Sequence, residues 1–136
     1  MSDGNRMTLF GLTERAMSAQ LVRMNTAASN LANAGSVTTT EAEAYRPIRP
    51  VFESELDRAS GLSSVRADQL VRAETAPTKR YDPFHPLADQ DGNVFEAPVD
   101  ETAEMVEIME SARQYSNLVQ ALQTAKQLML ETLRSN

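Results

Sequence analysis

The stretch of sequence that decides the fold is ETAEMVEIMESARQYSNLVQALQTAKQLMLETLR, residues 101–134. Mostly apolar residues recur in this stretch at alternating steps of three and four. This is the spacing of a heptad stripe along one face of an α-helix. Eight of the nine stripe positions are apolar: Met105, Ile108, Ala112, Tyr115, Val119, Leu122, Lys126, Met129 and Leu133. We therefore predict a helix from about residue 100 to residue 133, with Asp100 as its N-cap and glutamates in its first turns.

The apolar surface of this helix widens in its second half. Five apolar or small residues flank the stripe: Leu118, Ala121, Ala125, Leu128 and Leu130. One partner helix needs only a narrow seam, so an arc of this width predicts contact with more than one neighbour. Lys126 interrupts the stripe. The sequence leaves open whether it specifies a partner or extends along the surface with its ammonium group in water.

The first part of the chain repeats this pattern. A stripe of apolar residues spaced by seven is formed by Phe10, Met17, Met24 and Leu31. Leu21 and Ala28 fill intervening positions, and Glu14 breaks the series. This stripe predicts a second helix that begins near Thr8 and ends between Asn33 and Gly35, with Gly35 as its C-cap.

The middle of the chain, residues 36–98, has a different character. It contains all six prolines, and proline interrupts helices. We predict short strands at Val51–Leu56 and Val65–Ala73, with Gly61 in the turn between them. Extended or turned chain is expected at residues 80–86, and a tight turn at residues 89–93.

These patterns predict a mainly α fold with a small β or extended middle. The chain divides into a coiled-coil helix at 1–35, an extended or β-rich segment at 36–98 and a second coiled-coil helix at 99–136. We expect the two long terminal helices to pair as an antiparallel coiled coil. The middle is too small to cover both helices, so the remaining apolar surface is expected to contact copies of the chain or related subunits.

The composition excludes several classes of function. A net charge of −6 over 136 residues argues against a nucleic-acid partner, which needs a basic surface. Without cysteine the chain has no disulfide and no thiol nucleophile. No apolar run approaches the roughly 20 residues of a membrane span, so we expect no transmembrane segment. Residues 1–6 lack the basic start and apolar core of a cleaved signal peptide.

Few residues suggest a reactive site. His85, the only histidine, is interpreted as a turn residue that bonds to the backbone rather than as a metal ligand. Asp89 and Asp91 resemble the start of a calcium loop, but the glycine follows at the fourth position rather than the sixth, which favours a turn. The glutamates of residues 101–110 are explained by the helix dipole rather than by acid–base chemistry. We therefore expect no enzyme activity, no metal and no cofactor.

Several motifs resemble those of the bacterial flagellar basal-body rod protein family, in that family's order. Residues 28–33, Ala-Ser-Asn-Leu-Ala-Asn, resemble its A-x-N-L-A-N signature, and residues 44–47, Ala-Tyr-Arg-Pro, resemble a segment that follows it. Residues 81–94 are similar to the stretch Y-x-P-x-H-P-x-A-D-x-x-G-x-V of its proximal-rod members. These motifs are carried by Asn30, Leu31, Ala32, Asn33, Tyr81, Pro83, His85, Pro86, Asp89 and Gly92.

Two further segments extend the resemblance into the C-terminal helix. Residues 104–115 are similar to the core of that helix in proximal-rod proteins, and residues 125–130 to its final turn. Gly35-Ser36 replaces the more usual Asn-Thr pair, and residues 95–100 contain less asparagine than usual. These departures affect turns and leave every stripe position in place.

The resemblance implies a structural role. Proximal-rod proteins build a helical tube that transmits torque from rotor to hook and encloses the export channel, and so serves motility. Their terminal helices form an inner coiled-coil layer called D0. The implied partners are further copies, other rod subunits, the ring-to-rod adaptor and the flagellar type III export apparatus. The implied location is the periplasmic rod of the basal body, reached without a cleaved signal peptide.

On this interpretation the working residues are helix-packing positions rather than a catalytic site. They are Phe10, Met17, Leu21, Met24, Leu31, Met105, Ile108, Ala112, Tyr115, Val119, Leu122, Met129 and Leu133. Two alternatives stay open. A different flagellar axial subunit would share the terminal helices, although the middle has no room for the larger β domains of distal-rod and hook proteins. A cytoplasmic helical chaperone or adaptor would explain the acidity but not the motifs.

Overall fold

The computed structural model describes residues 8–135, so the prediction made for residues 1–6 lies outside the described residues. Two long helices, α1 (Leu9–Ala32) and α2 (Glu101–Ser135), stand at the two ends of this range. Five strands lie between them: β1 (Val37–Thr38), β2 (Ile48–Asp57), β3 (Leu62–Arg72), β4 (Thr78–Tyr81) and β5 (Asn93–Glu96). The predicted mainly α fold with a small β middle is confirmed.

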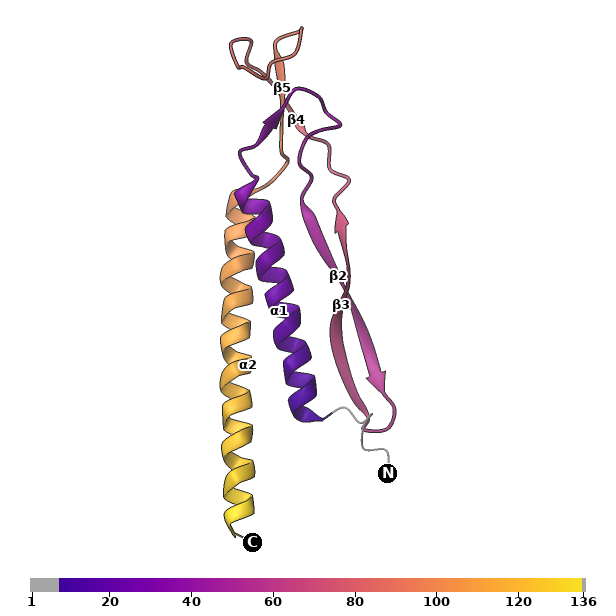
Figure 1. Cartoon of the computed structure of the whole chain (residues 1–136), viewed down its shortest axis with the longest axis vertical. Helices are drawn as coiled ribbons and strands as arrows, with labels where there is room; N and C mark the ends of the chain where they lie inside the picture. Colours follow the sequence, from indigo (N-terminus) through magenta and orange to yellow (C-terminus); the bar gives the residue numbers. More distant parts are fainter. Residues whose placement is uncertain (1–7, 136) are drawn as a thin grey trace.

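The helices and the longer strands form three adjacent layers. α1 lies in the middle, with α2 on one side and the β2–β3 hairpin on the other (Figure 1). The two helices run in opposite directions, because the chain reverses through the middle segment. A small antiparallel sheet of order β1-β5-β4 lies beyond the ends of the helices, away from the C-terminus (Figure 1).

Side-chain caps fix the helix ends. The Thr8 hydroxyl accepts a hydrogen bond from the Gly11 amide at 3.0 Å, and the Asp100 carboxylate accepts one from the Ala103 amide at 3.1 Å, as an N-cap does. The prediction that Gly35 caps α1 is wrong. Asn33 is the C-cap, and Gly35 lacks the positive φ of a glycine cap. The Asn33 side chain instead donates to the carbonyl of Ser29 at 2.8 Å, which closes the last turn.

The two strands predicted around Gly61 are confirmed and are longer than expected. β2 and β3 pair antiparallel from Ile48 opposite Arg72 to Asp57 opposite Leu62, with an irregularity between Val51 and Phe52. Gly61, in the turn, has a φ of 73°, a conformation that glycine adopts readily. The remaining strands have four residues or fewer, too short for a pattern of alternating side chains to predict them.

α2 extends past α1 at one end. α2 has 35 residues and α1 has 24, a difference of about 16 Å at 1.5 Å per residue. An antiparallel register that aligns Arg23 with Glu107, which form an ion pair, places Leu9 level with residue 121. Residues 122–135 therefore run beyond the described start of α1, as Figure 1 shows at the C-terminal end. In the described part of the chain, neither helix combines the length and the apolar character needed to cross a bilayer.

The core is made of small side chains. The buried apolar residues are Ala19, Ala27, Ala34, Ala44, Val94 and Ala97. The chain exposes 9443 Å² of surface, about a third more than the roughly 7,000 Å² expected of a compact monomer of its 15.0 kDa mass. Most large apolar side chains are therefore at least partly accessible to water in the single chain.

Candidate functional site

Asn30 joins the end of α1 to the start of the hairpin. Its side chain is fully buried. Nδ2 donates to the carbonyl oxygen of Ile48 at 3.0 Å, and Oδ1 accepts from the Ile48 amide and from the Tyr45 hydroxyl, both at 2.8 Å. The Asn30 amide thus makes with Ile48 the pair of hydrogen bonds that an adjacent strand would make. Two motifs that are separate in the sequence are bound together here.

The other residues of the same motif close the helix. The hydroxyl oxygens of Ser29 and Tyr45 lie 3.3 Å apart, within hydrogen-bond distance. The backbone oxygen of Asn33 accepts from the Ser36 hydroxyl at 2.8 Å, which orders the loop that follows. Leu31 is half-buried and Ala32 is exposed. The polar side chains of the motif therefore have architectural roles and offer no reactive group.

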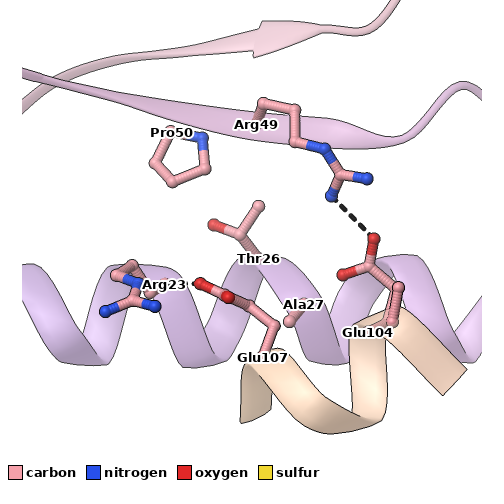
Figure 2. Close-up of a pocket in the computed structure, with 8 residues that line it drawn as sticks. Arg23, Thr26, Ala27, Arg49, Pro50, Glu104 and Glu107 are labelled. Atoms are coloured by element: carbon pink, nitrogen blue, oxygen red, sulfur yellow. Dashed lines mark hydrogen bonds and ion pairs between the residues drawn. The ribbon is translucent and has the colours of Figure 1, made fainter. Parts of the chain in front are cut away.

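A cavity of about 300 Å³ lies where α1, α2 and β2 meet. Figure 2 shows its lining residues, which include two ion pairs between different elements. Arg23 Nε of α1 donates to Glu107 Oε1 of α2 at 2.7 Å. Arg49 Nη1 of β2 donates to Glu104 Oε1 of α2 at 2.6 Å. α2 is thus fastened both to the neighbouring helix and to the hairpin.

The charges around this junction neutralise one another. The hydrogen bond to Glu107 raises the pKa of Arg23 above its ordinary value, against the opposing effect of burial, and the negative charges of Glu107 and Glu110 add to the increase. Glu104 is only 2% exposed, so its carboxylate depends on Arg49 for compensation. Because both acids that line the cavity are held by arginines, the geometry suits a structural clamp and not acid–base catalysis.

The sequence alone did not reveal this clamp. Glu104 and Glu107 were attributed to the helix dipole, and neither Arg23 nor Arg49 was singled out. The two glutamates are three residues apart, which places them on one face of the helix. That spacing was the only feature of the sequence that could have indicated a shared binding surface for arginines. Their arginines lie far away in the chain, so no local pattern connects the pairs.

His85 and Asp89 form hydrogen bonds within turns, as predicted. His85 Nδ1 accepts a hydrogen bond from the Leu87 amide at 3.0 Å. Asp89 Oδ1 accepts from the amides of Asp91 and Asn93 at 2.9 and 2.8 Å. Across residues 8–135, no three histidine, aspartate or glutamate side chains gather closely enough to hold a metal ion.

Gly92 shapes the loop that connects β4 to β5, here called the tip loop (residues 82–92). Its φ is 79°, and a Cβ atom at this position would lie 2.9 Å from Cε2 of Tyr81 and 3.1 Å from Cβ of Pro83. Only glycine fits this conformation and this close approach. Tyr81, Pro83 and Gly92 are thus one packing unit, while Pro86 is exposed.

The structure distributes the predicted helix-packing residues over two environments. Nine are half-buried: Phe10, Met17, Met24, Leu31, Ile108, Ala112, Tyr115, Val119 and Leu122. Four are exposed in the single chain: Leu21, Met105, Met129 and Leu133. The side chains buried on the helices are instead small or polar, namely Ala19, Thr26, Ala27, Asn30, Glu104 and Ser111. The contact between α1 and α2 is therefore partly polar, with the Arg23–Glu107 ion pair across it, and several large apolar side chains are left toward solvent.

Comparison with known proteins connects this architecture to a family. Residues 13–38 match the family model described as flagella basal body rod protein, and residues 90–135 match that of the flagellar basal body rod FlgEFG protein C-terminal region. The flagellar basal-body rod protein FlgC of Salmonella typhimurium is 35% identical over 127 residues, which cover 93% of this chain and 95% of the relative. FlgC proteins of Escherichia coli O6:H1 and Yersinia enterocolitica are 36% and 37% identical over the same shares of each chain.

This chain belongs to the FlgC family of flagellar basal-body rod proteins. The resemblance inferred from the motifs is confirmed, and FlgC proteins are structural rod proteins rather than enzymes. The family models cover most of α1 and all of α2 up to Ser135, the two elements whose exposed apolar faces are described above. The alternative of a cytoplasmic chaperone loses its support, since FlgC relatives match nearly the whole chain.

Proposed function

We propose that this FlgC-family chain is a subunit of the flagellar proximal rod that polymerises through its terminal helices. The supporting observation is a set of large apolar side chains on α2, each between 47% and 70% exposed: Met105, Val106, Met109, Leu128, Met129, Leu130 and Leu133. Burying one such side chain fully is worth about 1.5–3 kcal/mol. Neighbouring subunits would provide this burial, which the single chain lacks.

In this proposal one face of α2 packs on α1 and the opposite face contacts other subunits. The face toward α1 holds the buried Glu104 and Ser111 together with the half-buried Ile108, Tyr115 and Leu122. Heptad spacing along this face supports pairing of α1 and α2 as an antiparallel coiled coil of the D0 type. The exposed apolar residues Met105, Val106, Met109 and Leu130 face away from α1 and would contact other subunits.

The part of α2 beyond α1 gives the second argument for assembly. Residues 122–135 have no described α1 turn beside them, and Met129 and Leu133 continue the apolar face that contacts α1. A lone helical segment of this length is marginal in water. Helices of adjacent subunits would stabilise it, and repetition of such contacts would close the subunits into a helical tube.

The proposed role in the cell follows from this assembly. The tube would transmit torque and line the export channel for motility. Its partners would be other rod subunits, the ring-to-rod adaptor and the flagellar type III export apparatus, and its location would be the periplasmic rod. Two segments, 1–35 and 99–136, would then serve as assembly helices. The middle, 36–98, would be an outer spacer.

Leu130→Asp tests the proposal on the outward face. Leu130 is 57% exposed, so the variant should keep the fold of the single chain, while a charge in a dry contact between subunits costs several kcal/mol. We expect the variant to be absent from isolated basal bodies and the cells to be non-motile. Leu122→Asp, at a predicted packing position, should have the same effect.

Gln123→Asp is the matched control, because Gln123 is exposed and polar on the same helix. It should enter basal bodies normally. Circular dichroism of purified Leu130→Asp checks that its helices are retained. Normal motility of Leu130→Asp, or its normal yield in basal bodies, would contradict the proposal.

A further inference from the structure

The tip loop is held by hydrogen bonds within itself, and most of its motif residues serve its own structure. Within it the Asp82 amide donates to the Gly92 carbonyl at 2.8 Å, and the Asp89 amide donates to the Asn93 carbonyl at 2.9 Å. The hydrogen bonds accepted by the side chains of His85 and Asp89 add to this network. A loop held in one conformation loses little entropy when it binds a partner.

This rigid loop holds apolar side chains in water. Within the loop Phe84 is 97% exposed and Leu87 is 44% exposed, and the adjoining Tyr81, the last residue of β4, is 71% exposed. An aromatic side chain on a rigid base is the usual anchor of a protein–protein contact, because it buries a large area at small cost in side-chain entropy. The fold gives no structural reason for presenting Phe84 in this way, so the tip loop has the properties of a docking element.

The charges of the tip loop indicate what it docks on. The loop contains Asp82, Asp89 and Asp91 and no lysine or arginine. Asp82 is paired with Arg80, and Asp89 is used in the turn, whereas the Asp91 carboxylate has no ion-pair partner within residues 8–135. An acidic tip disfavours anionic lipid and favours a protein groove that is apolar with a positive charge at its edge.

α2 carries a groove of this kind on the same polypeptide. It is lined by Val106, Met109, Glu110 and Arg113. Val106 is 54% and Met109 is 70% exposed. Arg113 has no ion-pair partner in the described part of the chain, and the exposed Glu110 gives the groove a negative charge on its other side. Methionine sulfur and an arginine guanidinium both contact aromatic rings favourably, and Arg113 could also pair with a carboxylate.

We propose that the tip loop of one copy docks on the α2 groove of a second copy, with Phe84 between Val106 and Met109 and with Asp91 facing Arg113. The proposed contact is heterologous: each tip loop occupies the groove of the next copy, so it repeats from copy to copy, unlike a reciprocal exchange that would close on a dimer. This inference rests on the proposed function, and it assigns the outward face of α2 at Val106 and Met109 to the tip loop of a neighbouring copy rather than to a neighbouring helix.

Site-directed cross-linking tests this contact, because the chain has no cysteine of its own and each introduced cysteine is then its only one or one of two. The double variant Phe84→Cys/Met109→Cys is produced in motile cells, and isolated basal bodies are treated with a short bis-maleimide. We expect a ladder of covalent oligomers beyond the dimer. The matched control is Leu70→Cys/Met109→Cys, since Leu70 is 57% exposed on β3 and outside both surfaces. Dimers alone, links formed by either single variant, links to a different polypeptide, or no links would overturn the inference.

Self-association of the purified full-length chain provides the second measurement. Phe84→Ser should weaken it about tenfold in sedimentation experiments, equivalent to about 1.4 kcal/mol, while Leu70→Ser leaves it unchanged. An unchanged association constant for Phe84→Ser would overturn the inference even if the cysteine variants assemble poorly. Failure of the proposed function would look different, because the wild-type chain itself would then be missing from basal bodies.

Discussion

The buried carboxylate of Glu104 is neutralised by an arginine that is itself half exposed. Glu104 Oε1 lies 2.6 Å from Arg49 Nη1, with side-chain exposures of 3% for the glutamate and 51% for the arginine. The pair joins the first turn of α2 to the start of the hairpin, but the two residues do not depend on it equally. Water can replace Glu104 around Arg49, but it cannot replace Arg49 around Glu104.

The first prediction uses this asymmetry. Arg49→Ala leaves a buried charge without compensation and should lower the free energy of unfolding by about 2 kcal/mol. Glu104→Gln should cost less than half of that, because Arg49 is then hydrated and the amide still accepts a hydrogen bond. Urea unfolding followed by circular dichroism measures both values. Arg58→Ala, in the exposed hairpin turn, is the control. Equal losses for Arg49→Ala and Glu104→Gln would show that the two partners depend on each other equally.

The second prediction concerns Asn30. Asn30→Ala removes the partner of both backbone groups of Ile48 and of the Tyr45 hydroxyl. We expect a loss of about 3 kcal/mol, which would lower Tm by about 10 °C. Asn30→Asp keeps the acceptor but loses the donor to the Ile48 carbonyl. Its Tm should lie between those of the wild type and Asn30→Ala, or lower still. Asn25→Ala, exposed on the same helix, should melt like the wild type. A wild-type Tm for Asn30→Ala would mean that α1 and the hairpin are joined by other contacts.

The third prediction is a series of glycine-to-alanine substitutions. Gly61→Ala meets open space but keeps a φ of 73°, so it should cost about 1 kcal/mol. Gly92→Ala adds contacts of 2.9 and 3.1 Å to the same backbone conformation and should cost about 2–3 kcal/mol. Hydrogen exchange of the Asp82 and Asn93 amides should accelerate about thirtyfold or more in Gly92→Ala alone. Gly35→Ala, with ordinary φ and open space, is the neutral reference. Equal effects at Gly61 and Gly92 would exclude the packing argument for the tip loop.

The fourth prediction concerns pH. The pKa of Arg23 is raised in the folded chain, chiefly by its hydrogen bond to Glu107. A raised pKa contributes stability that is fully present below the unfolded pKa and lost only as the pH rises through the folded one. Arg23→Met should therefore lose about 1 kcal/mol to the same extent at about pH 6 and about pH 9. Urea unfolding at both pH values measures this loss.

The control for this experiment is Arg15→Met. Arg15 pairs with Glu55 at 3.3 Å, with side-chain exposures of 44% and 51%, so its loss should be smaller at both pH values. A loss for Arg23→Met that disappears at the higher pH would mean that Arg23 gives up its proton far below the range expected from its hydrogen bond.

Local signals in the sequence were sufficient for the helices and for the main hairpin. The 3-4 spacing predicted α2 almost to its ends, because a repeat over many turns leaves little choice of secondary structure. Thr8 and Asp100 were correctly placed at helix starts, since an N-cap bonds to amides within its own turn. Gly35 shows where such reasoning failed: glycine at a helix end usually serves as a cap, but the Asn33 side chain had already closed the last turn.

The sequence by itself determined that two long amphipathic helices enclose a short, proline-rich middle, because helix periodicity and proline act over a few residues. Only the tertiary structure decided which face of α2 turns toward α1. The apolar stripe suggested Met105 for that face, yet Met105 is 53% exposed and the buried positions are Glu104 and Ser111. The reason is physical: partners more than fifty residues away, such as Arg49 for Glu104, set the rotation of the helix, and small side chains allow the close approach.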